Sequence, residues 1–274
     1  MIGVPVYKMT GSGNDFVMLD ARISAPADWT PEDMQAVCAR GTGIGADGVV
    51  FVGPGSKPGS ARMIYFNADG SHAAMCGNAA LCSTRLAARL GLARGTRMML
   101  ETDAGTYDSR CDGEGERAEL HLAPVTAPTP VDGLSTTSGE HRVVLGTVGV
   151  PHLVVLVDDV DLVDIIRRGK ALRSDPALGA AGANVNFISA GPQPSEWRMR
   201  TYERGIEDET LACGTGAVAA ACALADWGLA KPPLWFWTRS GRRLEVRMRK
   251  ASADQYDDVW LGGEARLVVR GVIN

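Results

Sequence analysis

Apolar and polar residues alternate in short segments along the chain, and two Ala-rich runs interrupt them. Alternation over Trp197–Tyr202 and Leu234–Thr238 predicts half-buried strands, because successive side chains of a strand point to opposite faces. The continuous apolar run Leu153–Val157 has the length of a buried strand. The Ala-rich runs begin at Cys76 and Cys213, and since Ala is the best helix former, we expect a helix to start close to each cysteine. Many strands with few helices indicate an α+β fold.

Further elements follow from turn residues and helix-start signals. Thr30 followed by Pro31 is typical of a helix start. These signals predict a strand–turn–strand over 4–20, a short helix over 31–39, a strand over 62–66, β-hairpins over 97–122 and a short helix over 162–168.

The chain contains an internal repeat with an offset of 137 residues, half of its length of 274. Cys76 and Cys213 differ by this number (213 − 76), and a tyrosine stands 11 residues before each of them. The same offset aligns three further blocks: Thr10 with Thr147, 16–19 with 153–156, and 45–47 with 182–184. Agreement at one offset indicates a duplicated domain.

The repeat predicts two pseudo-symmetric domains. We expect the first over residues 1–122 and the second over 140–264, joined by the Pro-, Thr- and Ser-rich region 123–139. The final strand, 265–274, is expected to complete the first domain.

Two thiols at matched helix starts suggest acid–base chemistry on one carbon. The first N–H groups of a helix carry partial positive charge, which stabilises a thiolate and binds a carboxylate. Inversion of a stereocentre needs one group to remove a proton and another to return a proton to the opposite face. Cys76 and Cys213 are therefore the candidate pair.

Composition excludes several classes of protein and partner. A net charge of −4 and a pI near 5.6 argue against a nucleic-acid partner. The uncharged Ala- and Gly-rich run 211–225 is shorter than the roughly 20 apolar residues of a membrane span. No signal peptide is visible at the N-terminus, so we expect a soluble, cytoplasmic protein.

The other cysteines and the histidines carry no metal-site signal. Cys38, Cys111 and Cys222 are expected to be buried as small apolar residues. The four histidines form no tight ligand cluster, so no metal is expected. The five lysines lie in no pyridoxal-phosphate motif, so no cofactor is expected.

Several motifs together resemble the diaminopimelate epimerase family. They occur in the family's order over nearly the whole chain: Gly11-Ser12-Gly13-Asn14-Asp15-Phe16, residues 40–48, Phe66-Asn67-Ala68-Asp69-Gly70-Ser71, Met75-Cys76-Gly77-Asn78, Pro151-His152, Asn184-Val185-Asn186-Phe187, Glu203-Arg204-Gly205 and Ala212-Cys213-Gly214-Thr215-Gly216. The resemblance implies two similar domains, each a β-sheet or barrel wrapped around a central helix. It also implies cofactor-independent conversion of LL-diaminopimelate to meso-diaminopimelate, a step in lysine and peptidoglycan biosynthesis, by an enzyme that is often a homodimer.

The resemblance also assigns roles by position. It implies that Cys76 and Cys213 are the catalytic acid and base, and that His152 and Glu203 support them. The remaining implied residues bind the small amino-acid substrate. Gly77, Asn78, Gly214 and Thr215 hold the reacting carboxylate, and Asn14, Asn67, Asn184, Glu203 and Arg204 hold the rest. Alternatively, His152 has a purely structural role, in which its ring is hydrogen-bonded and takes no part in the reaction.

The chain departs from the family pattern at four positions. Ala79 and Leu81 replace the usual Gly and Arg after Cys76, and Val150 replaces an Asn before Pro151. Gly48 stands where some members have Gln. These changes leave the thiols untouched and bear on substrate specificity.

Other functions remain open at this point. A related two-thiol racemase could act on another amino acid, such as proline or histidine. A thiol-redox protein would close a Cys76–Cys213 disulfide, but would more usually carry a CxxC pair, which is absent here. Isomerases of the phenazine-biosynthesis type share the fold but lack the cysteine pair.

Overall fold

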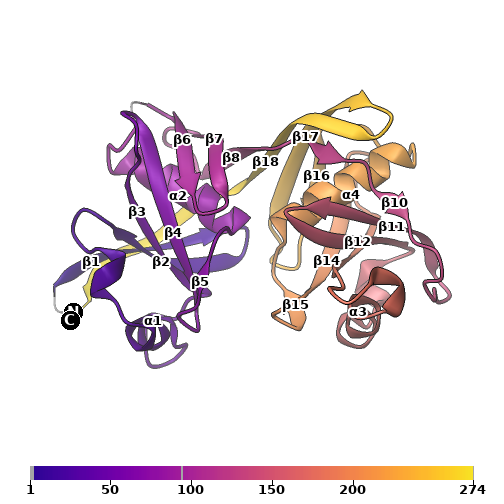
Figure 1. The fold of residues 1–274 in the computed structure, drawn as a ribbon, viewed down its shortest axis with the longest axis horizontal. Coiled ribbons are helices and arrows are strands. Elements are labelled where there is room, and N and C mark those ends of the chain that lie inside the picture. Colours follow the sequence, from indigo (N-terminus) through magenta and orange to yellow (C-terminus); the bar gives the residue numbers. More distant parts are fainter. Residues whose placement is uncertain (1–2, 94, 274) are drawn as a thin grey trace. The chain divides into compact units, whose positions relative to one another are not determined.

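A computed structural model describes residues 3–93 and 95–273, and the chain divides into two compact units. The first consists of Met1–His121 and Gly262–Asn274, and the second of Leu122–Leu261. Residues 123–139, the predicted link between the domains, fall within the second unit. Figure 1 shows strands gathered around one long helix in each unit.

The first unit contains mainly strands and two helices. Its elements are β1 (Val4–Gly11), β2 (Asn14–Asp20), α1 (Pro31–Cys38), β3 (Gly48–Pro54), β4 (Ser60–Asn67), β5 (His72–Ala73), α2 (Gly77–Arg89), β6 (Arg97–Thr102), β7 (Gly105–Cys111), β8 (Arg117–Leu122) and β19 (Arg266–Ile273). The last strand, β19, pairs antiparallel with β1. Thr30 caps α1, and its hydroxyl accepts a hydrogen bond from the Asp33 N–H.

The second unit also contains mainly strands and two α-helices. They are β9 (Val125–Thr126), β10 (Thr129–Pro130), β11 (Glu140–Val148), β12 (Val150–Val157), α3 (Ile165–Arg173), β13 (Asn184–Ala190), β14 (Glu196–Glu203), β15 (Asp208–Thr210), α4 (Gly214–Asp226), β16 (Leu234–Trp237), β17 (Arg243–Ser252) and β18 (Gln255–Glu264). The short strands β9 and β10 pair with β18 and β11. Burial alternates along β14 and β16, which confirms the predicted half-buried strands.

Strand registers repeat at the offset found in the sequence. In the first unit, Phe16 of β2 lies opposite Gly48 of β3 in a parallel pair. Exactly the corresponding positions 137 residues later, Leu153 and Val185, face each other in the parallel pair of β12 and β13. In the first unit, Ser60 of β4 lies opposite Met99 of β6. The residues 137 positions later, Trp197 of β14 and Phe236 of β16, also lie opposite each other. The two halves therefore share a topology, and the predicted α+β fold class is confirmed.

Helices α2 and α4 are the central helix of their units. Each has 13 residues, and their first and last residues are 137 positions apart. Residues 216–224 of α4 are all buried, and the helix contacts β11, β12, β13 and β17 (Figure 1). A helix that is apolar on every face requires protein on every face, and its small Ala side chains let the strands approach closely. Burial of Val218 and of Leu224 contributes about 1.5–3 kcal/mol each relative to exposure.

One predicted helix is displaced along the chain. The helix expected over 162–168 is α3, Ile165–Arg173, because the Asp164 carboxylate caps it by accepting from the Arg167 N–H at 3.1 Å. Leu162 lies in the preceding 3₁₀ turn and is 84% exposed. Within residues 3–93 and 95–273, the helices all fall short of the length and apolar character that crossing a bilayer requires.

Candidate active site

Cys76 and Cys213 each occupy the N-cap position of a central helix. Both residues have extended backbone dihedral angles, and helical structure begins at Gly77 and Gly214 respectively. The helices predicted to start close to the cysteines are thereby confirmed. The first hydrogen bond within each helix is donated by the N–H of Ala80 or Ala217 to the carbonyl oxygen of Cys76 or Cys213. The N–H groups of the three residues between have no partner within the helix, so each start suits a bound carboxylate.

Burial raises the thiol pKa of the four cysteines other than Cys76 and Cys213. Cys38, Cys111 and Cys222 are buried, as expected, and burial raises the pKa of each thiol, to about 11 for Cys38 and about 12 for Cys222. Burial raises the pKa of the Cys82 thiol as well. Thiols in such surroundings remain protonated and are poor nucleophiles and bases. Cys76 is partly exposed, whereas Cys213 is buried and its Sγ lies 3.7 Å from the Thr215 Oγ1.

Asn14 and Asn78 form one polar network with an aspartate. Asn78 Nδ2 donates to Asn14 Oδ1 at 2.6 Å, and Asn14 Nδ2 donates to Asp47 Oδ2 at 3.0 Å. Asp47 Oδ2 also accepts from the Asp15 N–H at 3.1 Å. The network brings the turn after β1 and the first turn of α2 together, so two predicted binding residues lie beside Cys76.

Two cations hold this network in place. Arg40 Nη2 donates to Asp15 Oδ1 at 2.6 Å and to Asp47 Oδ1 at 2.7 Å, and Lys8 pairs with Asp15 at 2.5 Å. Burial alone would raise the pKa of Asp15, but hydrogen bonds from Arg40 and Lys8 hold it below the usual value. No local sequence signal assigns a role to Asp47 or Arg40, because their partners are distant in the chain.

Asn67 lies at the end of β4, opposite Gly48 of β3. Its Nδ2 donates to the Ser71 hydroxyl at 3.0 Å within the turn that leads to β5. Gly48 adjoins Asp47 in sequence, so the strand register places Asn67 near the Asn14 network. Of the predicted binding residues of the first unit, Asn14 and Asn78 are joined at the start of α2, and Asn67 pairs with the neighbouring Gly48.

In the second unit, Asn184 holds the loop that follows β14. Its Oδ1 accepts from the Arg204 N–H at 2.8 Å, and Arg204 Nη1 donates to the Ala181 carbonyl at 3.1 Å. Burial raises the pKa of the neighbouring Glu203, and the Thr210 hydroxyl opposes this shift. A carboxylate with a raised pKa gains most from a cationic partner, such as a substrate ammonium group.

His152 is fully buried and lies opposite Asn184 in the pairing of β12 with β13. Burial lowers its pKa to about 3, a shift that the Val148 carbonyl only partly offsets. Asn186 Nδ2 lies 3.3 Å from His152 Nδ1, so the buried ring contacts a side-chain amide. His152 is therefore a neutral hydrogen-bonding group at neutral pH. Asn186 was quoted in a sequence motif without a role.

The departures from the family pattern differ in their surroundings. Ala79 and Leu81 are fully buried, so they belong to the packing around α2. A methyl group at Gly48 would lie 2.4 Å from the Phe66 carbonyl oxygen and 2.6 Å from Tyr65 Cε2, so no larger residue fits there without movement. Val150 is 37% exposed and is the one of the four with a substantially accessible side chain.

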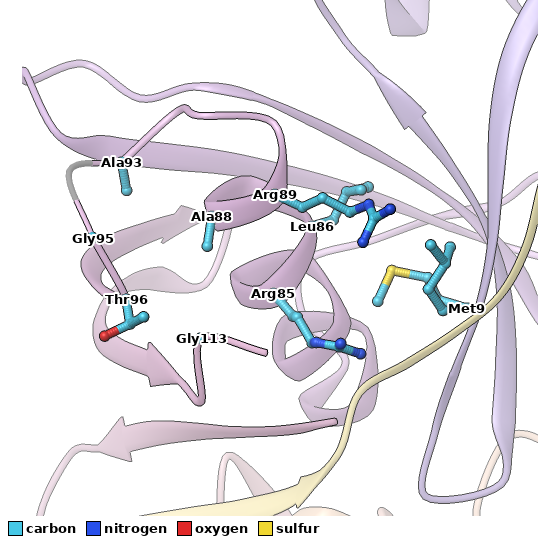
Figure 2. Close-up of a pocket in the computed structure, with 10 residues that line it drawn as sticks. Met9, Arg85, Leu86, Ala88, Arg89, Ala93, Gly95, Thr96 and Gly113 are labelled. Atoms are coloured by element: carbon cyan, nitrogen blue, oxygen red, sulfur yellow. The ribbon is translucent and has the colours of Figure 1, made fainter. Parts of the chain in front are cut away.

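A cavity of about 300 Å³ lies elsewhere in the first unit, at the C-terminal end of α2 (Figure 2). Arg85 and Arg89 extend beside it from the helix, and none of the predicted site residues lines it. Arg85 Nη1 donates to the Ala265 carbonyl at 2.7 Å. In the described part of the chain, no three His, Cys, Asp or Glu side chains come together in a way that could hold a metal ion.

Comparison with known proteins agrees with the resemblance. Residues 6–126 and 144–257 match the family described as Diaminopimelate epimerase. A diaminopimelate epimerase of Gemmatimonas aurantiaca is 44% identical over 97% of this chain and 98% of its own length. One from Chlorobaculum tepidum is 37% identical over 97% of this chain and 99% of its own length.

Solved structures with low sequence identity share the fold. A phenazine biosynthesis protein of the PhzF family from Bacillus anthracis superposes with a TM-score of 0.73 at 17% identity, covering all of both chains. A probable proline racemase from Agrobacterium radiobacter gives a TM-score of 0.68 at 17% identity, covering 99% of this chain and 93% of its own. At these identities the likeness concerns the fold alone.

Proposed function

The chain belongs to the diaminopimelate epimerase family, and on that basis we propose that it converts LL-diaminopimelate to meso-diaminopimelate with Cys76 and Cys213 as the acid–base pair. Members of this family are isomerases, so this chain is an enzyme of the isomerase class. The observation that carries the proposal is the position of the two cysteines: each is the N-cap of a 13-residue central helix, at equivalent positions of a duplicated fold.

The proton transfers balance without a further reactant. One cysteine acts as thiolate and takes the α-proton, forming S–H as the Cα–H bond breaks. The other cysteine, as thiol, gives its proton to the opposite face of the same carbon and becomes the thiolate. Each turnover therefore exchanges the protonation states of the two sulfurs, and the reverse reaction starts from the exchanged state.

The helix starts are proposed to stabilise the charge that develops. As the α-proton leaves, negative charge spreads onto the adjacent carboxylate. N–H groups of Gly77 and Asn78, and of Gly214 and Thr215, are preorganised donors for these oxygens. Loss of one such donor typically costs about 10²–10³ in turnover.

Side chains with fixed geometry are proposed to bind the remainder of the substrate. Arg204 offers a guanidinium group for a carboxylate, and Glu203 offers a carboxylate for an ammonium group. Asn14, Asn67 and Asn184 orient the molecule, and the bonds of Asn14 and Asn184 described above fix their amides before the substrate binds. His152 contributes as a neutral hydrogen-bonding group within this half of the site.

An NMR assay in heavy water tests the reaction and the substrate together. Purified protein with reducing agent and no added cofactor receives LL-diaminopimelate, and separate samples receive proline, histidine or glutamate. We expect deuterium at the α-position of diaminopimelate alone, with formation of the meso isomer. Exchange into another amino acid would instead identify a two-thiol racemase with a different substrate.

Cysteine variants test the pair. Cys76→Ser and Cys213→Ser are expected to lower epimerisation roughly 10²–10⁴-fold, the usual contribution of a positioned acid or base. Each variant should keep slow deuterium exchange with only one of the two stereoisomers, because the remaining thiolate reaches one face of the carbon. Near-normal epimerisation by either variant would refute the two-thiol mechanism.

A further inference from the structure

Asn186 is a fully buried side-chain amide in the middle of β13. Its Oδ1 accepts from the Thr201 hydroxyl at 3.0 Å, and its Nδ2 donates to the Leu153 carbonyl at 3.2 Å and contacts His152 Nδ1 at 3.3 Å. A buried amide is unfavourable unless it is hydrogen-bonded, and this one bonds to both neighbouring strands, β12 and β14. Its position is therefore rigidly defined.

The same amide touches the first turn of α4. A methyl group placed on Gly216 would lie 2.2 Å from Asn186 Oδ1 and 3.1 Å from Cys213 Sγ. The Asn186 oxygen and the Cys213 sulfur therefore lie against the same side of Gly216. Only glycine at position 216 allows α4 to approach β13 this closely. The hydrogen-bonded amide of Asn186 determines how close the helix can come to the strand.

The first unit lacks this arrangement. The residues 137 positions earlier are Val49 in place of Asn186 and Ala79 in place of Gly216, and both are fully buried. The duplicated fold is thus stable with an apolar contact between strand and central helix. A polar contact that needs three hydrogen bonds is therefore specific to the half that contains Cys213.

We propose that Asn186 is a positioning residue for the Cys213 thiol, acting through Gly216 and the first turn of α4. The proposal rests on the proposed function for the role of Cys213 in turnover. Asn186 fixes the distance between the first turn of α4 and β13. Because Cys213 is the N-cap residue of this helix, the position of its sulfur is fixed as well. Proton transfer is sensitive to such placement, because a displacement of about 1 Å can cost about 10²-fold in rate.

Two variants and a matched control test the proposal. Asn186→Ala removes the amide, and Gly216→Ala pushes the helix start away while adding a residue that favours helix formation. Ser189→Ala is the control, because Ser189 is also buried in β13 but bonds to the Val160 N–H, away from α4. Thermal melts and circular dichroism establish that each variant is folded.

Steady-state kinetics and alkylation of individual cysteines provide the readouts. We expect kcat to fall about 10–100-fold in both variants with a smaller change in KM, since the side chains proposed to bind the substrate are not replaced. The rate at which iodoacetamide labels Cys213, measured by peptide mass spectrometry, should change at least about threefold, while labelling of Cys76 stays constant. Ser189→Ala should alter neither quantity.

The alkylation readout needs no substrate and so separates the two proposals. If the wild-type protein fails to epimerise diaminopimelate but Asn186→Ala alters Cys213 labelling selectively, the proposed function fails and the positioning role stands. Equal changes at Cys76 and Cys213, an unchanged Cys213, or the same effect from Ser189→Ala would overturn the positioning role. If Asn186→Ala does not fold, Gly216→Ala gives the same decision.

Discussion

The side chains of Asn78 and Asn14 are joined by a hydrogen bond of 2.6 Å between Nδ2 and Oδ1. This bond connects the first turn of α2, two residues after Cys76, to the turn that follows β1. Since Asn14 also donates to Asp47 at 3.0 Å, its amide cannot flip without breaking both bonds. The orientation of Asn14 is therefore fixed in the absence of a ligand, which reduces the ordering cost of binding.

Removal of Asp47 should weaken substrate binding more than catalysis. In Asp47→Ala the Asn14 amide loses its acceptor, and Arg40 keeps only Asp15 as a partner. We expect KM to rise about tenfold, equivalent to about 1.4 kcal/mol, with a smaller change in kcat. Asp108→Ala, which removes an ion pair with the exposed Arg97, serves as the control in steady-state assays. A KM equal to that of the wild type would show that Asn14 needs no such support.

Buried His152 should make the protein less stable as the pH falls. Its folded-state pKa is about 3, against about 6.5 in an unfolded chain, so between these values the unfolded state binds more protons. Stability is therefore lost as the pH drops from 6.5 towards 3, by about 2 kcal/mol between pH 7 and pH 5.

Urea unfolding at pH 7 and pH 5 measures this dependence. His152→Asn should lose most of the pH-dependent difference, although it is less stable at pH 7 because the hydrogen bond with Asn186 is altered. The exposed His141 provides the control, and His141→Asn should keep the wild-type difference. If His152→Asn and the wild type depend equally on pH, the histidine is not neutral in the folded state.

The partly buried carboxylate of Glu203 is expected to lower the stability of the fold at pH 7 while it contributes to activity. Burial raises its folded-state pKa, so the folded protein binds more protons than the unfolded chain just above the unfolded pKa, and stability falls as the pH rises through this window. Glu203→Gln should therefore raise Tm at pH 7, and the gain should vanish near pH 4. Activity should fall about tenfold or more, because Gln cannot pair with an ammonium group.

Glu196 provides the comparison for that experiment. Its carboxylate pairs with Arg243 at 2.9 Å, so Glu196→Gln removes a favourable partner and should not raise Tm at pH 7. Equal Tm changes in the two variants would contradict the assignment of a burial cost to Glu203.

Gly48 should tolerate no side chain. The methyl group of Gly48→Ala would meet the Phe66 carbonyl at 2.4 Å and the Tyr65 ring at 2.6 Å, and we expect a loss of about 1–3 kcal/mol in the free energy of unfolding. Gly271→Ala in β19 has open space around it and should change stability by less than about 0.5 kcal/mol. Denaturant midpoints compare them, and a neutral Gly48→Ala would show that Tyr65 moves aside freely.

Local sequence signals predicted the elements that depend on neighbouring residues. The Ala-rich runs gave α2 and α4, and the offset of 137 anticipated the shared topology, because both are properties of the chain itself. Leu162 misled the analysis, since an apolar residue in a turn looks like part of a helix, whereas the cap at Asp164 decides where α3 begins.

Residues that work through distant partners escaped the sequence analysis. Asp47 lies 33 positions from Asn14, and Asn186 lies 34 positions from His152. Nothing in either local stretch indicates which polar side chain will meet which, because the register of the parallel strands determines it. The one available signal for Asn186 was a polar residue between the apolar Val185 and Phe187 of β13.

The pairing of β1 with β19 has a consequence for synthesis on the ribosome. Val4 lies opposite Ile273, so one edge of the first sheet is made from residues at the far end of the chain. At roughly 5–20 residues per second, β1 waits about 13–54 seconds for its partner, and residues 122–261 are synthesised in that interval. During that interval β1 presents an unpaired edge that can recruit other strands. The sheet of the first unit can therefore be completed only after the second unit has been synthesised.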